Sequence, residues 1–176
     1  SYTNGGEAPA ASNWAPVLFN GTFDGNGYAI SGIYVKDEKT AALFSNATGT
    51  IKNLTIKDSY FEGTKYISAF VGQFVAVTDK AVMPSLTIDN CVNYAELCTT
   101  KKDSLLGSMV GDAFANANKS TYLTFSITNC VNYGKITTTP SGTIYVGGIA
   151  GRIFGCPAVI DNCANFADIE NVTVIS

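Results

Sequence analysis

Residues 86–97 read LTIDNCVNYAEL, residues 125–136 read FSITNCVNYGKI, and residues 158–169 read AVIDNCANFADI. We align residues 54–63, LTIKDSYFEG, as a fourth and more divergent copy. Successive copies then begin about 32, 39 and 33 residues apart, which suits repeat proteins whose units bury their apolar faces against neighbouring units. The repeat therefore decides the fold class before any single element is assigned.

A second strand-like segment recurs between these copies. It reads ISAFVGQF at 67–74, LGSMVGDAF at 106–114 and VGGIAGRIF at 146–154, with a shorter relative, AALFSN, at 41–46. Helical repeats have similar periods, but here the apolar residues alternate or form blocks of three to five, which is typical of β-strands. The sequence predicts an all-β fold, a right-handed parallel β-helix (β-solenoid) with irregular coils of about 32–40 residues.

Composition limits the possible classes of protein. The 176 residues are 46% hydrophobic and 14% charged, enough for a substantial core. The net charge of −3 and the scattered basic residues argue against nucleic-acid binding. The chain contains no apolar run of about 18 residues, so no membrane span is predicted. We expect a poorly ordered segment at 1–12 and one β-solenoid domain at 13–176, as a piece of a longer chain.

Equivalent residues of stacked coils lie about 4.8 Å apart, so each alignment column predicts a ladder. One predicted core column contains Ile56, Ile88, Ile127 and Ile160, and another contains Leu97, Ile136 and Ile169. The NCxN box predicts polar or small structural ladders at Asn90, Asn129, Asn162, Cys91, Cys130, Cys163, Asn93, Asn132 and Asn165.

The NCxN box has two interpretations. Stacked asparagines can bond along the stack and to turn backbone, and a small cysteine fits a corner that leucine would overfill. The alternative is a metal site, but zinc sites usually add His or a CxxC pair, and this chain has neither. We expect no metal and no cofactor, and we expect Cys91, Cys130 and Cys163 to be buried, with at least two of them reduced.

Several segments resemble a known family. These are FNGTFDGNGYAISGIYV at 19–35, preceded by Trp14 and Pro16, LFSNATGTIKNLTI at 43–56, and the YVGGIAGRI and NCVNYGKI boxes. They resemble the GLUG-motif β-helical regions of bacterial surface proteins, as found beside immunoglobulin A peptidases and in large surface proteins of gut-type anaerobes. The resemblance implies an extracellular location, at the cell surface or secreted, and a role as a stalk or interaction surface.

Catalysis is disfavoured by the residue types present. The chain has no His, which removes the usual catalytic triads and most zinc hydrolase sites. Asp89 and Asp161 lie two coils apart, about 9 to 10 Å by ladder spacing, near the separation that an inverting glycosidase needs. A carbohydrate-binding or polysaccharide-degrading β-helix is therefore the alternative to a non-enzyme, and a subunit that stacks head to tail through its open ends is another.

The unequal coil lengths indicate where partners bind. Insertions in a solenoid collect in loops, here around Thr78–Ser85, Thr99–Ser104 and Asn116–Tyr122. The main expectation is a non-catalytic extracellular scaffold or adhesive module whose loops contact partners. Those partners are neighbouring domains of the same polypeptide, a host or cell-surface protein or glycan, or further copies at the solenoid ends. The candidate contact residues are Lys80, Lys101, Lys102, Lys119 and Tyr122.

Overall fold

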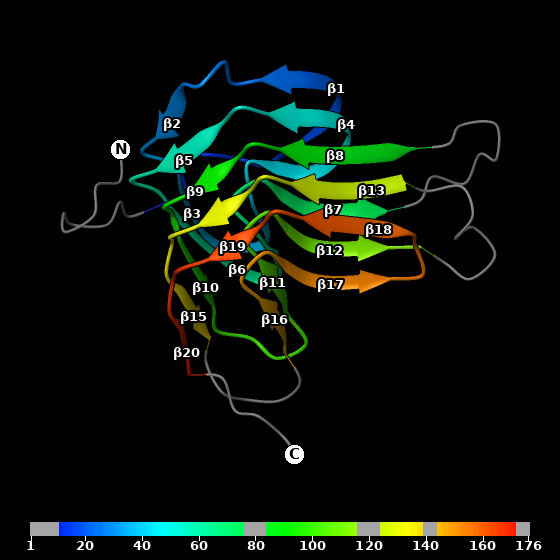
Figure 1. Cartoon of the computed structure of the whole chain (residues 1–176). Coiled ribbons are helices and arrows are strands. Elements are labelled where there is room, and N and C mark those ends of the chain that lie inside the picture. The colour runs from blue at the N-terminus through cyan, green and yellow to red at the C-terminus, as the bar shows by residue number, and fades with distance from the viewer. Residues whose placement is uncertain (1–10, 76–83, 116–123, 139–143, 172–176) are drawn as a thin grey trace.

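A computed structural model describes residues 11–75, 84–115, 124–138 and 144–171 (Figure 1). Within these ranges the regular structure is entirely β, with strands in three sheets, and every pairing between strands is parallel. The expected all-β class is confirmed, and the arrangement is consistent with a β-helix or solenoid. The same ranges contain no helix long and apolar enough to cross a bilayer.

The largest sheet has eight strands. They are β1 (Val17–Asp24), β4 (Phe44–Lys52), β7 (Val71–Val75), β8 (Ser85–Asp89), β12 (Val110–Phe114), β13 (Thr124–Thr128), β17 (Ala150–Phe154) and β18 (Ala158–Asp161).

The other two sheets have seven and five strands. The seven-stranded sheet contains β3 (Tyr34–Ala41), β6 (Tyr60–Ile67), β10 (Glu96–Thr99), β11 (Leu105–Gly107), β15 (Ile136–Thr138), β16 (Tyr145–Gly147) and β20 (Ile169–Glu170). The five-stranded sheet contains β2 (Ala29–Ser31), β5 (Thr55–Lys57), β9 (Val92–Asn93), β14 (Val131–Asn132) and β19 (Ala164–Asn165).

The register of the largest sheet divides the chain into five layers. Val17 pairs with Phe44, Phe44 with Val71, Val71 with Val110, and Val110 with Ala150. We call the stretches that begin at these residues layers 1 to 5. Layers 1 and 2 contain 27 residues each and layers 3 and 4 contain 39 and 40, so the expected coil length of about 32–40 is wrong for the first two layers.

The later layers are longer because two continuous strands of layer 2 are each split in two. The first half of β4 pairs with β7 and its second half with β8. In the same way, β6 pairs first with β10 and then with β11. The extra residues of layer 3 therefore fall between Val75 and Ser85 and between Thr99 and Leu105.

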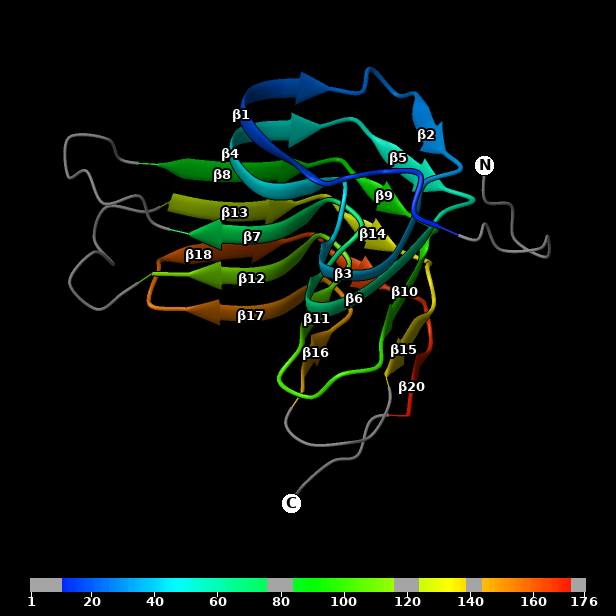
Figure 2. The same cartoon turned by 180° about the vertical axis from the view of Figure 1, so that it is seen from behind.

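Figures 1 and 2 show what this division does to the shape of the described part. Strands β1 and β4 bend, so that β7, β12 and β17 run in the opposite direction to β8, β13 and β18. These two groups of strands form one arm. Strands β10, β15 and β20, with β11 and β16, extend away from it as a second arm (Figure 1).

The aliphatic columns lie inside these arms except at the last layer, where Ile160 and Ile169 are exposed, so the prediction that these two residues belong to the core is wrong. Ile51, Ile88, Ile127 and Ile160 are register partners, as are Leu97, Ile136 and Ile169. The prediction that Ile56 belongs to the first column is wrong, because Ile56 pairs with Asn93. The sequence contains two nearby Thr-Ile pairs, at 50–51 and 55–56, and the first of them is the equivalent of Thr87-Ile88.

Glycine is required where the two arms meet. A Cβ atom added to Gly111 would lie 2.8 Å from the carbonyl oxygen of Gly72 and 3.0 Å from the backbone nitrogen of Ile67. These are fixed backbone atoms that cannot move aside cheaply. Gly111 therefore lets β12 approach β6 closely enough to close the layer.

Candidate functional site

The NCxN corners are the most regular polar feature of the described structure. Each NCxN box begins directly after a strand of the largest sheet and ends with a short strand of the five-stranded sheet. The first asparagine of each corner has a left-handed backbone, with φ of 50° at Asn90, 54° at Asn129 and 50° at Asn162. Asparagine tolerates this conformation better than most residues, so the local turn explains the residue type.

The second asparagines form a ladder. Asn93 and Asn132 are fully buried, and Asn165 lies at the exposed end. Asn93 Nδ2 donates to Asn132 Oδ1 at 2.8 Å, and Asn132 Nδ2 donates to Asn165 Oδ1 at 2.7 Å. Each side chain also bonds the backbone two residues on, as Asn132 does with both the carbonyl oxygen and the N–H of Gly134. The ladder thus joins the layers and fixes the turns.

The first asparagines form a second, less continuous ladder. Asn162 Nδ2 donates to Asn129 Oδ1 at 2.7 Å, and Asn90 Nδ2 donates to Asn53 Oδ1 at 2.8 Å. Asn129, however, donates to Asp89 Oδ1 at 2.8 Å rather than to Asn90. Donors in this ladder point toward the preceding layer, whereas donors in the Asn93–Asn132–Asn165 ladder point toward the following layer.

Asp89 and Asp161 share one column with Thr128 between them. Thr128 Oγ1 donates to Asp89 Oδ1 at 2.6 Å, and these bonds from Thr128 and Asn129 lower the pKa of the Asp89 carboxyl. At the other end of the column, Asp24 pairs with Lys52 at 3.3 Å. Asp89 is therefore held as an ionised acceptor, which suits a structural carboxylate better than a general acid.

The cysteine column has a related geometry. All five cysteines are free; Cys91 and Cys130 are buried, but Cys163 is only partly buried, so the expectation of burial is wrong at the last corner. Cys130 Sγ donates to the carbonyl oxygens of Thr128 at 3.0 Å and of Ile88 at 3.6 Å. Interaction with Cys91 and burial raise the pKa of the Cys130 thiol, which keeps it protonated and unreactive.

An aromatic column stands beside the corners. The rings of Tyr94 and Tyr133 stack at 5.0 Å between centroids, and those of Tyr133 and Phe166 stack at 5.4 Å. Their edges are exposed while their faces cover one another. A ligand ring could therefore stack only at an end of this column.

A hollow that the sequence did not predict lies between the two arms. The residues that directly follow Gly72, Gly111 and Gly151 form a polar column. They are Gln73, Asp112 and Arg152, which are register partners. Arg152 Nε donates to Asp112 Oδ1 at 2.8 Å and Nη2 to Oδ2 at 3.0 Å, and Gln73 lies 3.4 Å from Oδ2. Buried Asp112 raises the pKa of Arg152 by accepting these bonds.

Aromatic rings surround this ion pair. The Arg152 guanidinium lies 5.1 Å from the ring centroid of Phe114 and 5.7 Å from that of Tyr145, and Phe154 stacks on Phe114 at 5.6 Å. Together with Gly151 and Ile153, these residues line a hollow of about 480 Å³. The polar column could have been predicted from the aligned boxes VGQF, VGDAF and AGRIF, since the residue after the glycine is polar in each.

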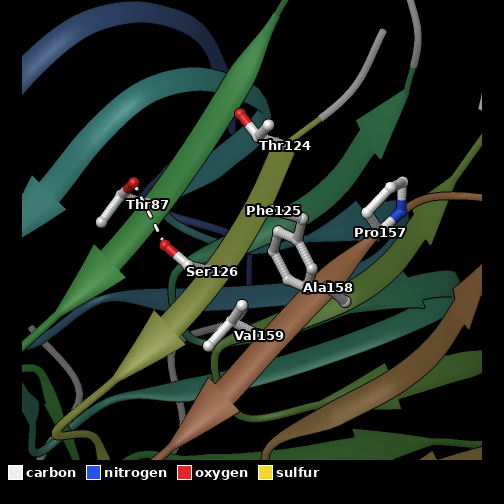
Figure 3. Close-up of a pocket in the computed structure, with 7 residues that line it drawn as sticks. All are labelled: Thr87, Thr124, Phe125, Ser126, Pro157, Ala158 and Val159. Carbon is white, nitrogen blue, oxygen red and sulfur yellow. Dashed lines mark hydrogen bonds between the residues drawn. The ribbon is translucent and has the colours of Figure 1, made fainter. Parts of the chain in front are cut away.

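A second, smaller hollow lies on the outer face of β8, β13 and β18. Figure 3 shows Thr87, Ser126 and Val159 on these neighbouring strands, with a hydrogen bond from Ser126 Oγ to Thr87 Oγ1 at 3.2 Å. The hollow has a volume of about 210 Å³ and no charged side chain lines it. It offers little to orient a ligand.

The candidate contact loops are only partly described. Lys101 and Lys102 are exposed between β10 and β11, whereas Lys80, Lys119 and Tyr122 lie outside the described residues. The loop of Lys101 is held by Ser104 Oγ, which donates to the Lys101 carbonyl at 2.7 Å. Among the described residues, no group of three or more His, Cys, Asp or Glu side chains is arranged to hold a metal ion.

Comparisons with known proteins give little more. No protein-family model matches the chain, and no curated protein matches it. Among solved structures, it is similar to a 1.30 Å crystal structure of a candidate immunoglobulin A1 protease from Bacteroides ovatus, with 9% identity and a TM-score of 0.36. The match covers 88% of this chain and 63% of the other. Similarity at this level shows neither a shared fold nor a shared activity.

Proposed function

We propose that this chain is a non-catalytic module of a bacterial surface protein, a right-handed parallel β-helix built from GLUG-like repeats. In this role it is displayed outside the cell, at the surface or secreted, as a rigid scaffold or adhesive segment. The parallel sheets and their register-matched columns support the β-helix. The segments around 19–35 and the NCxN boxes support the family, through sequence resemblance alone.

One observation carries the scaffold proposal: the polar groups at the corners are already committed to neighbouring layers. Asn93 and Asn132 bond to each other and to their own turns. Asp89 accepts bonds from Thr128 and Asn129 on its Oδ1 atom, so its protonation would weaken the contact between layers 3 and 4. A catalytic acid or base must change protonation state during turnover, and such a change here would weaken the fold.

The scaffold proposal is tested by an activity screen with a matched variant. The protein and Asp89→Asn are incubated with a panel of neutral and acidic polysaccharides, and new reducing ends and unsaturated products are measured. We expect neither protein to release products above the buffer control. Product release that the Asp89→Asn substitution abolishes, in protein that remains folded by circular dichroism, would replace the scaffold with a polysaccharide-degrading enzyme.

The adhesive role is tested at the described loop. Lys101→Ala/Lys102→Ala removes two exposed charges between β10 and β11, and Lys36→Ala/Lys57→Ala removes two exposed charges elsewhere. Binding of each protein to epithelial cells and to immobilised extracellular-matrix glycans is measured in the same assay. We expect the first variant to bind at least threefold more weakly than the second. Equal binding by both variants would move the contact surface away from this loop.

A second candidate function, carbohydrate binding, is favoured by the hollow around Arg152. It combines a charged group with exposed aromatic rings, a combination that sugar-binding sites use. Titration calorimetry with acidic oligosaccharides tests it, with Phe154→Ala as the variant because Phe154 is exposed and its loss leaves the Arg152–Asp112 pair intact. Heat of binding that disappears in Phe154→Ala would support this candidate, and no heat with either protein would reject it.

A further inference from the structure

The face formed by layer 5 is built like an internal interface. Ile160 is 46% exposed, although its partners Ile127 and Ile88 are fully buried, and Ile169 is 37% exposed, although Ile136 is fully buried. Strands β17, β18, β19 and β20 of layer 5, together with β16 at the end of layer 4, are the outer strands of their sheets on this face. Apolar columns and unpaired strand edges therefore end together on one surface.

The hydrogen bonds that end on this face run in a fixed direction from donor to acceptor. Asn132 uses one N–H on the Gly134 carbonyl and the other on Asn165. Asn165 uses one N–H on the Ala167 carbonyl, and its second N–H has no partner among the described residues. The end of this ladder presents a donor.

The neighbouring ladder, which contains Asn129 and Asn162, ends on this face with an acceptor instead of a donor. Asn162 donates to Asn129, so its Oδ1 faces outward with no donor among the described residues. A matching surface must therefore donate to Asn162 and accept from Asn165. Asparagines at both positions of a further corner do so, because this is how layer 5 meets layer 4.

Charge adds a third requirement. Asp161 ends the column in which Lys52 neutralises Asp24 and Thr128 donates to Asp89. A residue placed against Asp161 is stabilising when it carries a hydroxyl or an ammonium group and destabilising when it carries a carboxylate.

We propose that the layer 5 face binds a further parallel β-coil whose corner reads Thr or Lys, then Asn, two residues, and Asn. The partner is a β-solenoid segment of this chemistry, which continues the three sheets and both asparagine ladders. The inference rests on the ends of the ladders and holds whether or not the loops are adhesive.

A second copy of this chain stacked head to tail does not meet the requirement. By register, layer 1 would place Gly25 against Asn162 and Ile30 against Asn165. Gly25 has no side chain, and the side chain of Ile30 can neither donate nor accept a hydrogen bond. Asp24 would also come within about 4.8 Å of Asp161, adding repulsion between like charges.

In the test, residues 171–176 are replaced by a copy of residues 138–149 followed by a copy of residues 110–137, which places a duplicate of layer 4 in register after Glu170. Cys163 is the reporter. Cys163 is only partly buried because no layer covers it, so docking should slow its reaction with a thiol reagent at least tenfold, toward the rate of Cys130. The matched control carries Gly and Ile in place of the two asparagines of the added corner. We expect protection in the first extension and at least fivefold less in the control.

Three results would overturn the proposal. Equal protection by both extensions would show that apolar contact alone specifies the partner. An unprotected Cys163 beside protected Cys91 and Cys130 would show that a folded chain does not dock the coil. Concentration-dependent protection in the unextended chain would show that the partner is a second copy.

A second measurement covers an extension that disturbs folding. The intact chain is titrated with a peptide that copies residues 124–138, and the side-chain amide signals of Asn162 and Asn165 are followed by NMR. We expect shifts at these two amides that are absent with a peptide in which Gly and Ile replace Asn129 and Asn132. Unchanged signals, or equal shifts with both peptides, would reject the proposal.

Discussion

Single asparagines perform two tasks at each corner of this molecule. Asn129 has a φ of 54° and also links Asp89 and Asn162 through its side chain. The left-handed backbone costs a residue with a Cβ about 1–2 kcal/mol, which glycine avoids and asparagine partly offsets by local bonding. Backbone conformation and side-chain bonding can therefore be separated by substitution.

We expect Asn129→Ala to lower the free energy of unfolding by about 1 kcal/mol more than Asn129→Gly. Both variants lose the same side-chain bonds, so their difference reports the backbone strain. Urea unfolding followed by circular dichroism measures it. Equal stability of the two variants would show that the corner does not need a left-handed residue.

The buried ladder predicts a larger effect at Asn132. Its side chain bonds to Asn93, Asn165 and the backbone of Gly134 without access to water. We expect Asn132→Ala to cost about 3 kcal/mol of unfolding free energy, because partners are left unsatisfied in the interior. Asn165→Ala, at the exposed end, is the control. A loss at Asn132 no larger than at Asn165 would contradict the ladder.

Asp89 makes stability depend on pH. Hydrogen bonds from Thr128 and Asn129 lower its pKa in the folded protein, so its contribution is present above the unfolded pKa of about 3.9 and is lost as pH falls further. We expect the difference in unfolding free energy between the parent and Asp89→Asn to shrink between pH 7 and pH 3. A difference that stays constant over this range would show that the carboxylate is not used as an ionised acceptor.

At the scale of elements, the strand pattern of the largest sheet separates core from surface. Ile127 is fully buried in a column with Ile88, whereas Thr124 on the same strand is exposed. We expect Ile127→Asp to unfold the protein or to cost several kcal/mol, because it places an unpaired charge in an apolar column. Thr124→Asp should leave the melting temperature nearly unchanged. Equal effects of both substitutions would mean that the inward and outward faces are reversed.

The sequence allowed the strand class and most columns to be predicted, because the NCxN box repeats with little change. It failed at layer 2, where Ile56 was chosen over Ile51. Both isoleucines follow a threonine, and only the pairing of Ile51 with Ile88 decides between them. Register in a repeat that has lost its signature cysteine depends on the position of the turn, here Asn53 with its φ of 54°.

At the scale of the whole molecule, two features required the three-dimensional structure. The hollow around Arg152 joins residues of β12, β16 and β17, which meet only because the two arms fold toward a common corner. The short first two layers were hidden because their continuous strands β4 and β6 correspond to split pairs elsewhere. The spacing between repeat copies in the sequence therefore depends on loop insertions as well as on the number of residues in the basic layer.

The central claim is that the layers stack in parallel and in register, and methyl NMR tests it most directly. With isoleucine δ1 methyl groups labelled, the account predicts nuclear Overhauser contacts from Ile51 to Ile88, from Ile88 to Ile127, and from Ile127 to Ile160. No contact between Ile51 and Ile160 is expected, because two layers separate them. Absence of the three sequential contacts, or a contact between Ile51 and Ile160, would contradict the stack.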